Sequence, residues 1–265
     1  MKLVTYDQAG EPRAGIIEND LVFEAGSIFH PVPGDVIGPL STITLMAPVP
    51  KPEKIVCVGL NYRDHAAESG QEIPTTPILF AKFPNAIVGP GAAIQIPPIT
   101  EQVDYEAELG VVIGKTARAV KVDEAIDYVL GYTCVNDVSA RDLQFQDGQW
   151  VRGKTLDTFC PIGPWIVTAD EITDPQTLDI RCVVNGVVLQ DSSTAQMVFG
   201  VAELVSFISQ GITLGPGDII ATGTPPGVGF ARKPPIWLRP GDIVRIEIDG
   251  IGVLENPVTD RGDYW

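Results

Sequence analysis

Two acidic residues stand two positions apart, just before the apolar run 111–113. If this segment is a β-strand, Glu106 and Glu108 project from one face and Ala107 from the other, because side chains alternate along a strand. Two carboxylates held roughly 6–7 Å apart in this way repel each other unless a cation lies between them. Carboxylate oxygens suit Mg²⁺ or Mn²⁺, so the pair predicts a metal site; a solvated strand face is the alternative.

A third carboxylate, Asp137, follows a second apolar stretch at residues 134–135. A carboxylate at the edge of a buried run is costly unless it is paired or bound to a cation. Asp137 also suits the N-cap of a helix that would begin at residue 138. As a metal ligand it would join Glu106 and Glu108 and leave about three positions of an octahedral ion for water and substrate.

An imidazole and a carboxylate stand three residues apart in the segment 62–70, which predicts a short helix. His65 and Glu68 are then neighbours on one helical face. A carboxylate beside an imidazole orients it and raises its basicity, as the activation of water requires. A surface contact is the plainer reading, but the chain has two histidines, and the other, His30, belongs to the amino-terminal segment.

The composition is that of a folded protein, with 45% hydrophobic and 20% charged residues over 265 positions. A formal charge of −16 argues against nucleic acid and anionic membranes as partners. The sequence shows no signal peptide and no apolar run of about 18 residues, so we expect a soluble, cytoplasmic protein. The four cysteines form no C-x-x-C pair and are expected to be buried free thiols.

A proline-rich stretch at residues 47–54 divides the chain into two predicted domains. Residues 1–50 form a small antiparallel β domain in this prediction, because short strand-like runs alternate with turns. Residues 51–265 form the larger domain.

Strand signals dominate the larger domain. Asn185-Gly186 between two β-branched runs predicts a hairpin, and the Pro-Gly pairs at 216–217 and 240–241 predict tight turns before strands. No Gly-x-Gly-x-x-Gly segment follows a strand, so a Rossmann nucleotide site is not expected. The fold class is therefore a β-rich α+β protein with few helices, which we expect at residues 62–70, 122–131 and 201–211.

Several segments of the chain together resemble the fumarylacetoacetate hydrolase family, in the family's order and over residues 53–265. They are VGLNYRDHAAE, LFAKFPNAIVGPG, DYEAELGVVIGK, VNDVSARDLQ, WVRGKTLDTFCPIGPW, NGVVLQDSSTAQM and ATGTPPGVG. The chain looks like the bacterial branch with a small amino-terminal domain, often labelled 2-hydroxyhepta-2,4-diene-1,7-dioate isomerase. The resemblance implies a mixed β-roll, a homodimer, and Mg²⁺ or Mn²⁺ held by Glu106, Glu108 and Asp137.

The resemblance also implies catalytic roles for three residues. His65 and Glu68 match a lid pair that becomes ordered when substrate binds, and Lys154 matches a lysine near the metal and the keto acid. An ammonium group offers a point charge to an oxyanion. Without the resemblance, Lys154 reads as a solvated lysine.

Four further residues match substrate-contacting positions. Arg141 and Gln144 lie one helical turn apart, Thr224 matches a contact to a substrate carboxylate, and Lys82 matches a more peripheral lysine. The arginine fork suits a carboxylate, and the glycines around Thr224 allow backbone N–H groups to approach an anion. A surface ion pair for Arg141 and a plain turn at 223–229 are the alternatives.

The implied substrate is a small anionic 2-oxo acid whose enolate the metal stabilises. Such an enolate leads to C–C cleavage of an acylpyruvate such as fumarylpyruvate, to decarboxylation of oxaloacetate, or to isomerisation of a 2-hydroxydienoate. The His65–Glu68 pair favours hydrolysis, because hydrolysis needs an activated water, and this would place the enzyme in aromatic catabolism. Decarboxylation ranks second and isomerisation third. A catalytically silent metal- or ligand-binding protein is the alternative of another class.

Overall fold

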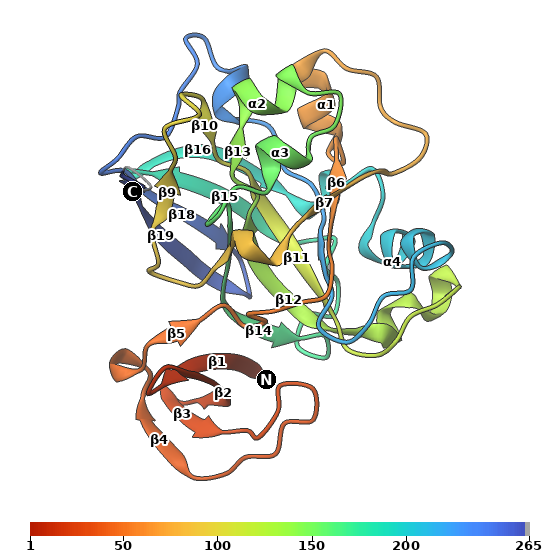
Figure 1. Ribbon diagram of the computed structural model, residues 1–265. Coiled ribbons are helices and arrows are strands. Elements are labelled where there is room, and N and C mark those ends of the chain that lie inside the picture. The colour runs from red at the N-terminus through yellow and green to blue at the C-terminus, as the bar shows by residue number, and fades with distance from the viewer. Residues whose placement is uncertain (263–265) are drawn as a thin grey trace.

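The computed structural model describes residues 1–262, and β-strands dominate its regular structure (Figure 1). The predicted fold class, a β-rich mixed β-roll with few helices, is confirmed. The last three residues of the predicted larger domain lie outside the described residues. Within residues 1–262, no helix is long and apolar enough to cross a membrane.

The largest sheet has twelve strands, and its main path runs β4-β3-β2-β1-β14-β12-β11-β17-β6-β7. β5 pairs with β1, and β8 pairs with β14. Its strands are β1 (Lys2–Gln8), β2 (Glu11–Glu18), β3 (Leu21–Glu24), β4 (Val36–Pro39), β5 (Leu45–Met46), β6 (Ile55–Gly59), β7 (Ile78–Lys82), β8 (Ile87–Val88), β11 (Ala107–Ile113), β12 (Val129–Asn136), β14 (Cys160–Thr168) and β17 (Ile219–Ala221).

A five-stranded sheet packs against the first and runs in the order β16-β15-β18-β19-β9. The predicted Asn185-Gly186 hairpin joins its strands β15 and β16, and both turn residues have positive φ, as this type of turn requires. Its strands are β9 (Ile94–Ile96), β15 (Asp179–Val184), β16 (Val187–Ser193), β18 (Ile243–Ile248) and β19 (Gly252–Asp260). A two-stranded sheet pairs β10 (Val103–Asp104) with β13 (Ser139–Ala140).

The helices are short. The predicted helices at 62–70 and 201–211 are present, whereas the short helix α3 was not predicted. The α-helices are α1 (Arg63–Ser69), α2 (Arg141–Gln146), α3 (Val151–Lys154) and α4 (Val201–Ser209). The 3₁₀ turns are η1 (Leu40–Thr42), η2 (Pro84–Ala86), η3 (Val122–Tyr128), η4 (Thr194–Gln196) and η5 (Gly229–Ala231).

Strand β11 is buried along its whole length, between β12 and β17. Leu109, Val111 and Ile113 pack into the core cluster that also contains Ile246 of the five-stranded sheet, and Val112 packs into a second cluster. Because the side chains alternate, Glu108 shares the face of Val112. The two layers of apolar packing hold this strand rigidly, and with it the acidic side chains at its beginning.

The predicted helix at 122–131 is only partly correct. A 3₁₀ turn, η3, ends at Tyr128, and the chain then enters β12. Gly131 was predicted to stop a helix, but it lies within β12 and pairs with Val112 on one side and Thr168 on the other. The apolar residues before Gly131 are drawn into the sheet because β11 and β14 offer backbone partners on both sides.

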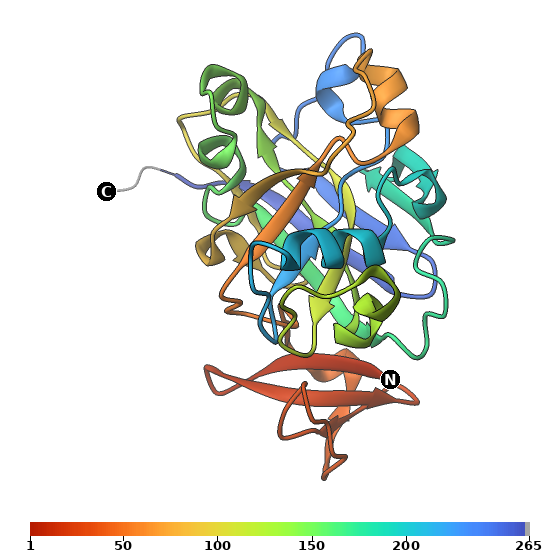
Figure 2. The ribbon, with the colours of Figure 1, turned by 90° about the vertical axis from the view of Figure 1, so that its right-hand side faces the viewer.

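The amino-terminal residues form a small antiparallel β region that Figure 2 shows as a layer at one end of the molecule. It continues the large sheet, because Lys2 and Leu3 of β1 pair with Val167 and Ile166 of β14. Helices α1, α2 and α3 gather at the opposite end (Figure 1). The division into two domains at residue 50 stays a prediction.

We expect Gly131→Ala to destabilise the fold by about 3 kcal/mol, because overpacking against rigid backbone is costly. A Cβ on Gly131 would lie 2.2 Å from the carbonyl oxygen of Val167. Urea unfolding measures the effect. Gly148→Ala is the control, since its Cβ would meet no heavy atom within 4 Å; equal stability of the two variants would contradict the expected clash.

Candidate metal centre and active site

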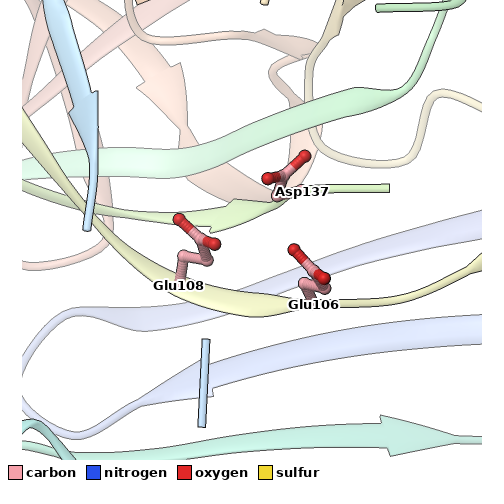
Figure 3. A group of neighbouring side chains, drawn as sticks. All are labelled: Glu106, Glu108 and Asp137. Atoms are coloured by element: carbon pink, nitrogen blue, oxygen red, sulfur yellow. The ribbon is translucent and has the colours of Figure 1, made fainter. Parts of the chain in front are cut away.

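Three buried carboxylates converge at the point where β11 begins and β12 ends (Figure 3). Glu106, Glu108 and Asp137 each offer an oxygen, and these oxygens lie within 4.8 Å of one another. The strand register brings them together, because Ala107 pairs with Asn136 and the Asp137 backbone N–H donates to the Glu106 carbonyl at 2.9 Å. Asp137 does not cap a helix, since α2 begins at Arg141.

Buried cations surround this carboxylate cluster. The Lys154 ammonium lies 2.6 Å from Glu106 Oε2 and 2.9 Å from Asp137 Oδ2. The Arg141 guanidinium donates from Nη2 to Glu106 Oε1 at 2.6 Å. Helices α2 and α3 place these two side chains, so the segment between β12 and β14 carries Asp137 together with the cations that face it.

Lys82 lies behind Asp137 and does not line the cavity. Its Nζ is 2.7 Å from Asp137 Oδ1, but its three N–H groups donate to the backbone carbonyls of Val138, Lys154 and Phe159. Asp137 Oδ1 therefore gains Coulomb attraction but no hydrogen bond, and it remains a buried oxygen without a donor. This geometry gives Lys82 a role in holding Asp137 and α3, while the predicted contact to substrate stays a prediction.

Together with the buried Asp104, which pairs with Arg141, the cluster brings four carboxylates against three cations. Burial would raise the pKa of Glu106, but the ammonium of Lys154 and the guanidinium of Arg141 outweigh burial and hold it at about 2. Burial, followed by the carboxylates of Asp137 and Glu106, raises the pKa of Glu108 well above its ordinary value. A divalent cation would satisfy the free oxygen of Asp137 and the charge of Glu108, so the donor set fits Mg²⁺ or Mn²⁺.

Arg141 is fixed on three sides and keeps part of its donor capacity. Its Nε donates to Asp104 at 2.8 Å and its Nη1 to Gln144 at 2.9 Å, in addition to the bond to Glu106. Its plane lies over the ring of Phe230, 4.5 Å from the centroid. An arginine has five N–H groups, so two remain for a bound anion.

The predicted lid pair is formed. On α1, His65 Nδ1 lies 3.2 Å from Glu68 Oε2, and the Gly227 backbone N–H donates to both oxygens of Glu68. Because a carboxylate only accepts, the pair favours the tautomer with the proton on Nδ1 and leaves Nε2 as a base. The side chains of Asp64 and Arg63 tie α1 to Ser192 and to the Met197 carbonyl.

A cavity brings most of the predicted site together. Four aromatic side chains from different elements form its apolar walls: Phe80, Phe145, Trp150 and Phe230. Its polar lining comes from Gln71, which was not predicted, and from seven predicted residues, namely His65, Glu106, Glu108, Arg141, Gln144, Lys154 and Thr224. An imidazole, an ammonium group, a guanidinium group and two carboxylates of the triad thus face one space with apolar walls.

The sequence prediction missed two buried residues that hold the site. Asp104 accepts from Arg141 and also from the backbone N–H groups of Gly229 and Phe230. Asn136 accepts from the backbone N–H of Glu106 at 3.1 Å. Asp104 continues the two-residue spacing of the acidic pair, which is a signal that the sequence carries; nothing local distinguishes Asn136.

Residues 54–259 match the family model described as the fumarylacetoacetate (FAA) hydrolase C-terminal region. The chain belongs to the fumarylacetoacetate hydrolase family. The predicted resemblance is confirmed, and the buried carboxylate triad is consistent with the divalent-metal site of this family of enzymes.

Relatives within this family bear different activity names. A Xenopus laevis protein named mitochondrial oxaloacetate tautomerase is 53% identical over 220 residues, which cover 82% of this chain and 69% of that protein. A fumarylacetoacetate hydrolase structure from Exiguobacterium antarcticum is 39% identical, with a TM-score of 0.88 over 98% of this chain and 100% of that one. A structure named 2-hydroxyhepta-2,4-diene-1,7-dioate isomerase from Mycobacterium marinum is 41% identical, with a TM-score of 0.83 over 99% and 100%.

We expect Glu108→Gln to stabilise the metal-free protein at neutral and alkaline pH. The folded pKa of Glu108 lies above the unfolded value of about 4.3, so proton binding favours the fold. That stability is fully present below the unfolded pKa and is lost as the pH rises through the folded pKa. The amide of the variant stays neutral and avoids this loss.

Thermal unfolding against pH, with EDTA and with Mg²⁺, measures both effects. Mg²⁺ should raise the melting temperature of the wild type much more than that of Glu108→Gln, because a neutral amide attracts the ion less than a carboxylate does. Glu11→Gln, at an exposed position of β2, is the control. Equal stabilisation of Glu108→Gln and wild type by Mg²⁺ would show that Glu108 is not a ligand.

Proposed function

We propose that this protein interconverts the enol and keto forms of a small 2-oxo diacid of the oxaloacetate class. The observation that carries the proposal is that His65, whose Nδ1 faces Glu68, and the Lys154 ammonium line the same cavity as Glu106 and Glu108. Enolisation needs a base beside a carbon acid and positive charge beside the oxygen that becomes negative. The 53% identity to a protein named oxaloacetate tautomerase supports this substrate class.

Glu106, Glu108 and Asp137 would hold Mg²⁺ or Mn²⁺ in this proposal. The ion, when bound, polarises the 2-oxo group and makes the neighbouring C–H bond more acidic.

The anionic ends of the substrate are held by neutral and positive groups at the cavity wall. Arg141 supplies its two remaining N–H groups, and Gln144 supplies its amide, whose oxygen already accepts from Arg141. Thr224, in the segment that follows β17, supplies a hydroxyl group. These residues supply the local attraction that a chain of charge −16 needs for an anion.

The proton transfer is assigned to His65, and the stabilisation of the enolate is assigned to Lys154. His65 Nε2 takes the proton from C3, while Glu68 stabilises the resulting imidazolium through Nδ1. Burial opposes the charge on Lys154, but Asp137 and Glu106 outweigh burial and raise its pKa. Lys154 is therefore an ammonium group that stabilises the negative oxygen of the enolate. Return of the proton from His65 to that oxygen gives the enol.

Hydrolysis of an acylpyruvate such as fumarylpyruvate is the second candidate, and the sequence alone ranks it first. The His65–Glu68 pair favours it, because a base at Nε2 activates a water as readily as it takes a C3 proton. Hydrolysis shares the enolate with tautomerisation and adds attack on the carbonyl at C4. Decarboxylation of oxaloacetate also starts from this arrangement. The predicted homodimer and cytoplasmic location stay predictions.

We expect His65→Ala to slow the tautomerisation of oxaloacetate by roughly two to four orders of magnitude, because the base is lost. The assay follows the enol absorbance of oxaloacetate with Mg²⁺ and with EDTA, and follows C3 deuterium exchange by NMR. His30→Ala, at an exposed position outside the cavity, is the control.

The same assay separates the candidate reactions. Release of pyruvate from oxaloacetate faster than enol loss would identify a decarboxylase, and rapid cleavage of fumarylpyruvate would identify a hydrolase. Undiminished enol–keto exchange in His65→Ala would contradict the role of His65. Wild-type activity that is unchanged by EDTA would contradict the role of the metal.

A further inference from the structure

Gln190 of β16 connects two parts of the site from outside the cavity. Its side chain is buried, with the residue 1% exposed. Its Oε1 accepts from the backbone N–H of Ala107 at 2.8 Å, and its Nε2 donates to Thr224 Oγ1 and to the Pro225 carbonyl, each at 2.8 Å. One amide thus joins the residue between Glu106 and Glu108 to the loop that carries Thr224.

The orientation of this amide follows from its partners. A backbone N–H only donates, so the atom that faces Ala107 must be the oxygen. A proline carbonyl only accepts, so the atom that faces Pro225 must be the nitrogen. The direction of the third bond, from Gln190 to Thr224, is then determined as well.

This direction sets the polarity of the Thr224 hydroxyl. A hydroxyl has one proton and two lone pairs, and Gln190 occupies a lone pair of Thr224. Within residues 1–262 the Thr224 hydroxyl donates to no acceptor, although the residue is only 5% exposed and lines the cavity. Its proton is therefore available to an anion inside the cavity.

We infer that Gln190 is a positioning residue that makes Thr224 a hydrogen-bond donor to a carboxylate of the substrate. The inference rests on the proposed function, because it takes a 2-oxo acid as the anion. Gln190 touches neither the substrate nor the cavity; it acts through Thr224 and through the backbone of Ala107. The contact to an anion is made in the ground state and persists in the transition state, so its loss raises KM more than it lowers kcat.

Gln190→Glu tests this polarity directly. The introduced carboxylate still accepts from Ala107, but towards Thr224 it also accepts, so the hydroxyl proton turns away from the cavity. A hydrogen bond to a charged group is lost, and KM for oxaloacetate should rise about tenfold or more while kcat changes by less than about threefold. Gln190→Met removes the donor without adding charge and should also raise KM. This variant replaces Gln190→Glu in the test if Gln190→Glu does not fold.

Gln176→Glu is the matched control. Gln176 also accepts from a backbone N–H, that of Val201, and donates to a backbone carbonyl, that of Thr194, but it does not line the cavity. Its KM should equal that of the wild type. An equal rise of KM in Gln176→Glu would show that the effect comes from general destabilisation, and it would overturn the inference.

A double-mutant cycle with Thr224→Val separates positioning from structure. Once the hydroxyl is absent, Gln190→Glu should add little to KM, because the two residues act as one unit. Additive effects of the two substitutions would overturn the inference. Thr224→Ser keeps the hydroxyl group that Thr224→Val lacks, so its KM should lie near the wild-type value.

Calorimetry with oxalate as the probe, in the presence of Mg²⁺, distinguishes this inference from the proposed function. Wild type that binds oxalate at least tenfold more tightly than Gln190→Glu supports the inference. Equal binding by both proteins overturns the inference alone. Wild type that binds neither oxalate nor oxaloacetate overturns the proposed function and the inference with it.

Discussion

A buried imbalance of charge underlies the whole site. Four carboxylates, at Asp104, Glu106, Glu108 and Asp137, lie inside the protein with three cations, at Lys82, Arg141 and Lys154. Burying charge costs several kcal/mol per ion unless partners compensate it. The cations compensate three of the carboxylates, and Glu108 is left to take up a proton or to share a metal. The folded protein therefore favours the binding of a cation beside Glu108, in the wall of the cavity.

The same charges position the groups to which we assign contacts with the substrate. Arg141 cannot move without breaking its bonds to Asp104 and Glu106, so its free N–H groups keep a constant direction. Asp104 also accepts from the loop residues Gly229 and Phe230, and Gly227 of this loop donates to Glu68. His65 on α1, Arg141 and the carboxylate triad are thus linked through one loop. Preorganisation of this kind lowers the cost of stabilising an enolate.

Short-range patterns were sufficient to predict several local pairings of the site and one hairpin. The spacing of Glu106 and Glu108, the three-residue step from His65 to Glu68, and Asn185-Gly186 each depend on local geometry alone. These features recur in the structure where the sequence places them. The order of the motifs identified the family and, through it, the fold.

The supporting residues depend on pairings between distant segments, which no local pattern encodes. Gly131 does not end a helix, because β11 and β14 pair with it and its neighbours in the sheet. Lys82 and Gln190 act through partners that are more than 30 positions away. In the sequence Gln190 passes for an ordinary strand residue, and Lys82 stands out only through the family resemblance. The buried partners of both residues are brought together only when the sheets assemble.

Anomalous diffraction from crystals soaked in Mn²⁺ tests the central claim most directly. A single manganese peak bounded by oxygens of Glu106, Glu108 and Asp137 is the predicted result, and the peak should vanish in Glu108→Gln. Soaking with oxalate should add density between the metal and Arg141. A peak at other acidic residues, or the absence of any peak in crystals of the wild type, would contradict the account of this site.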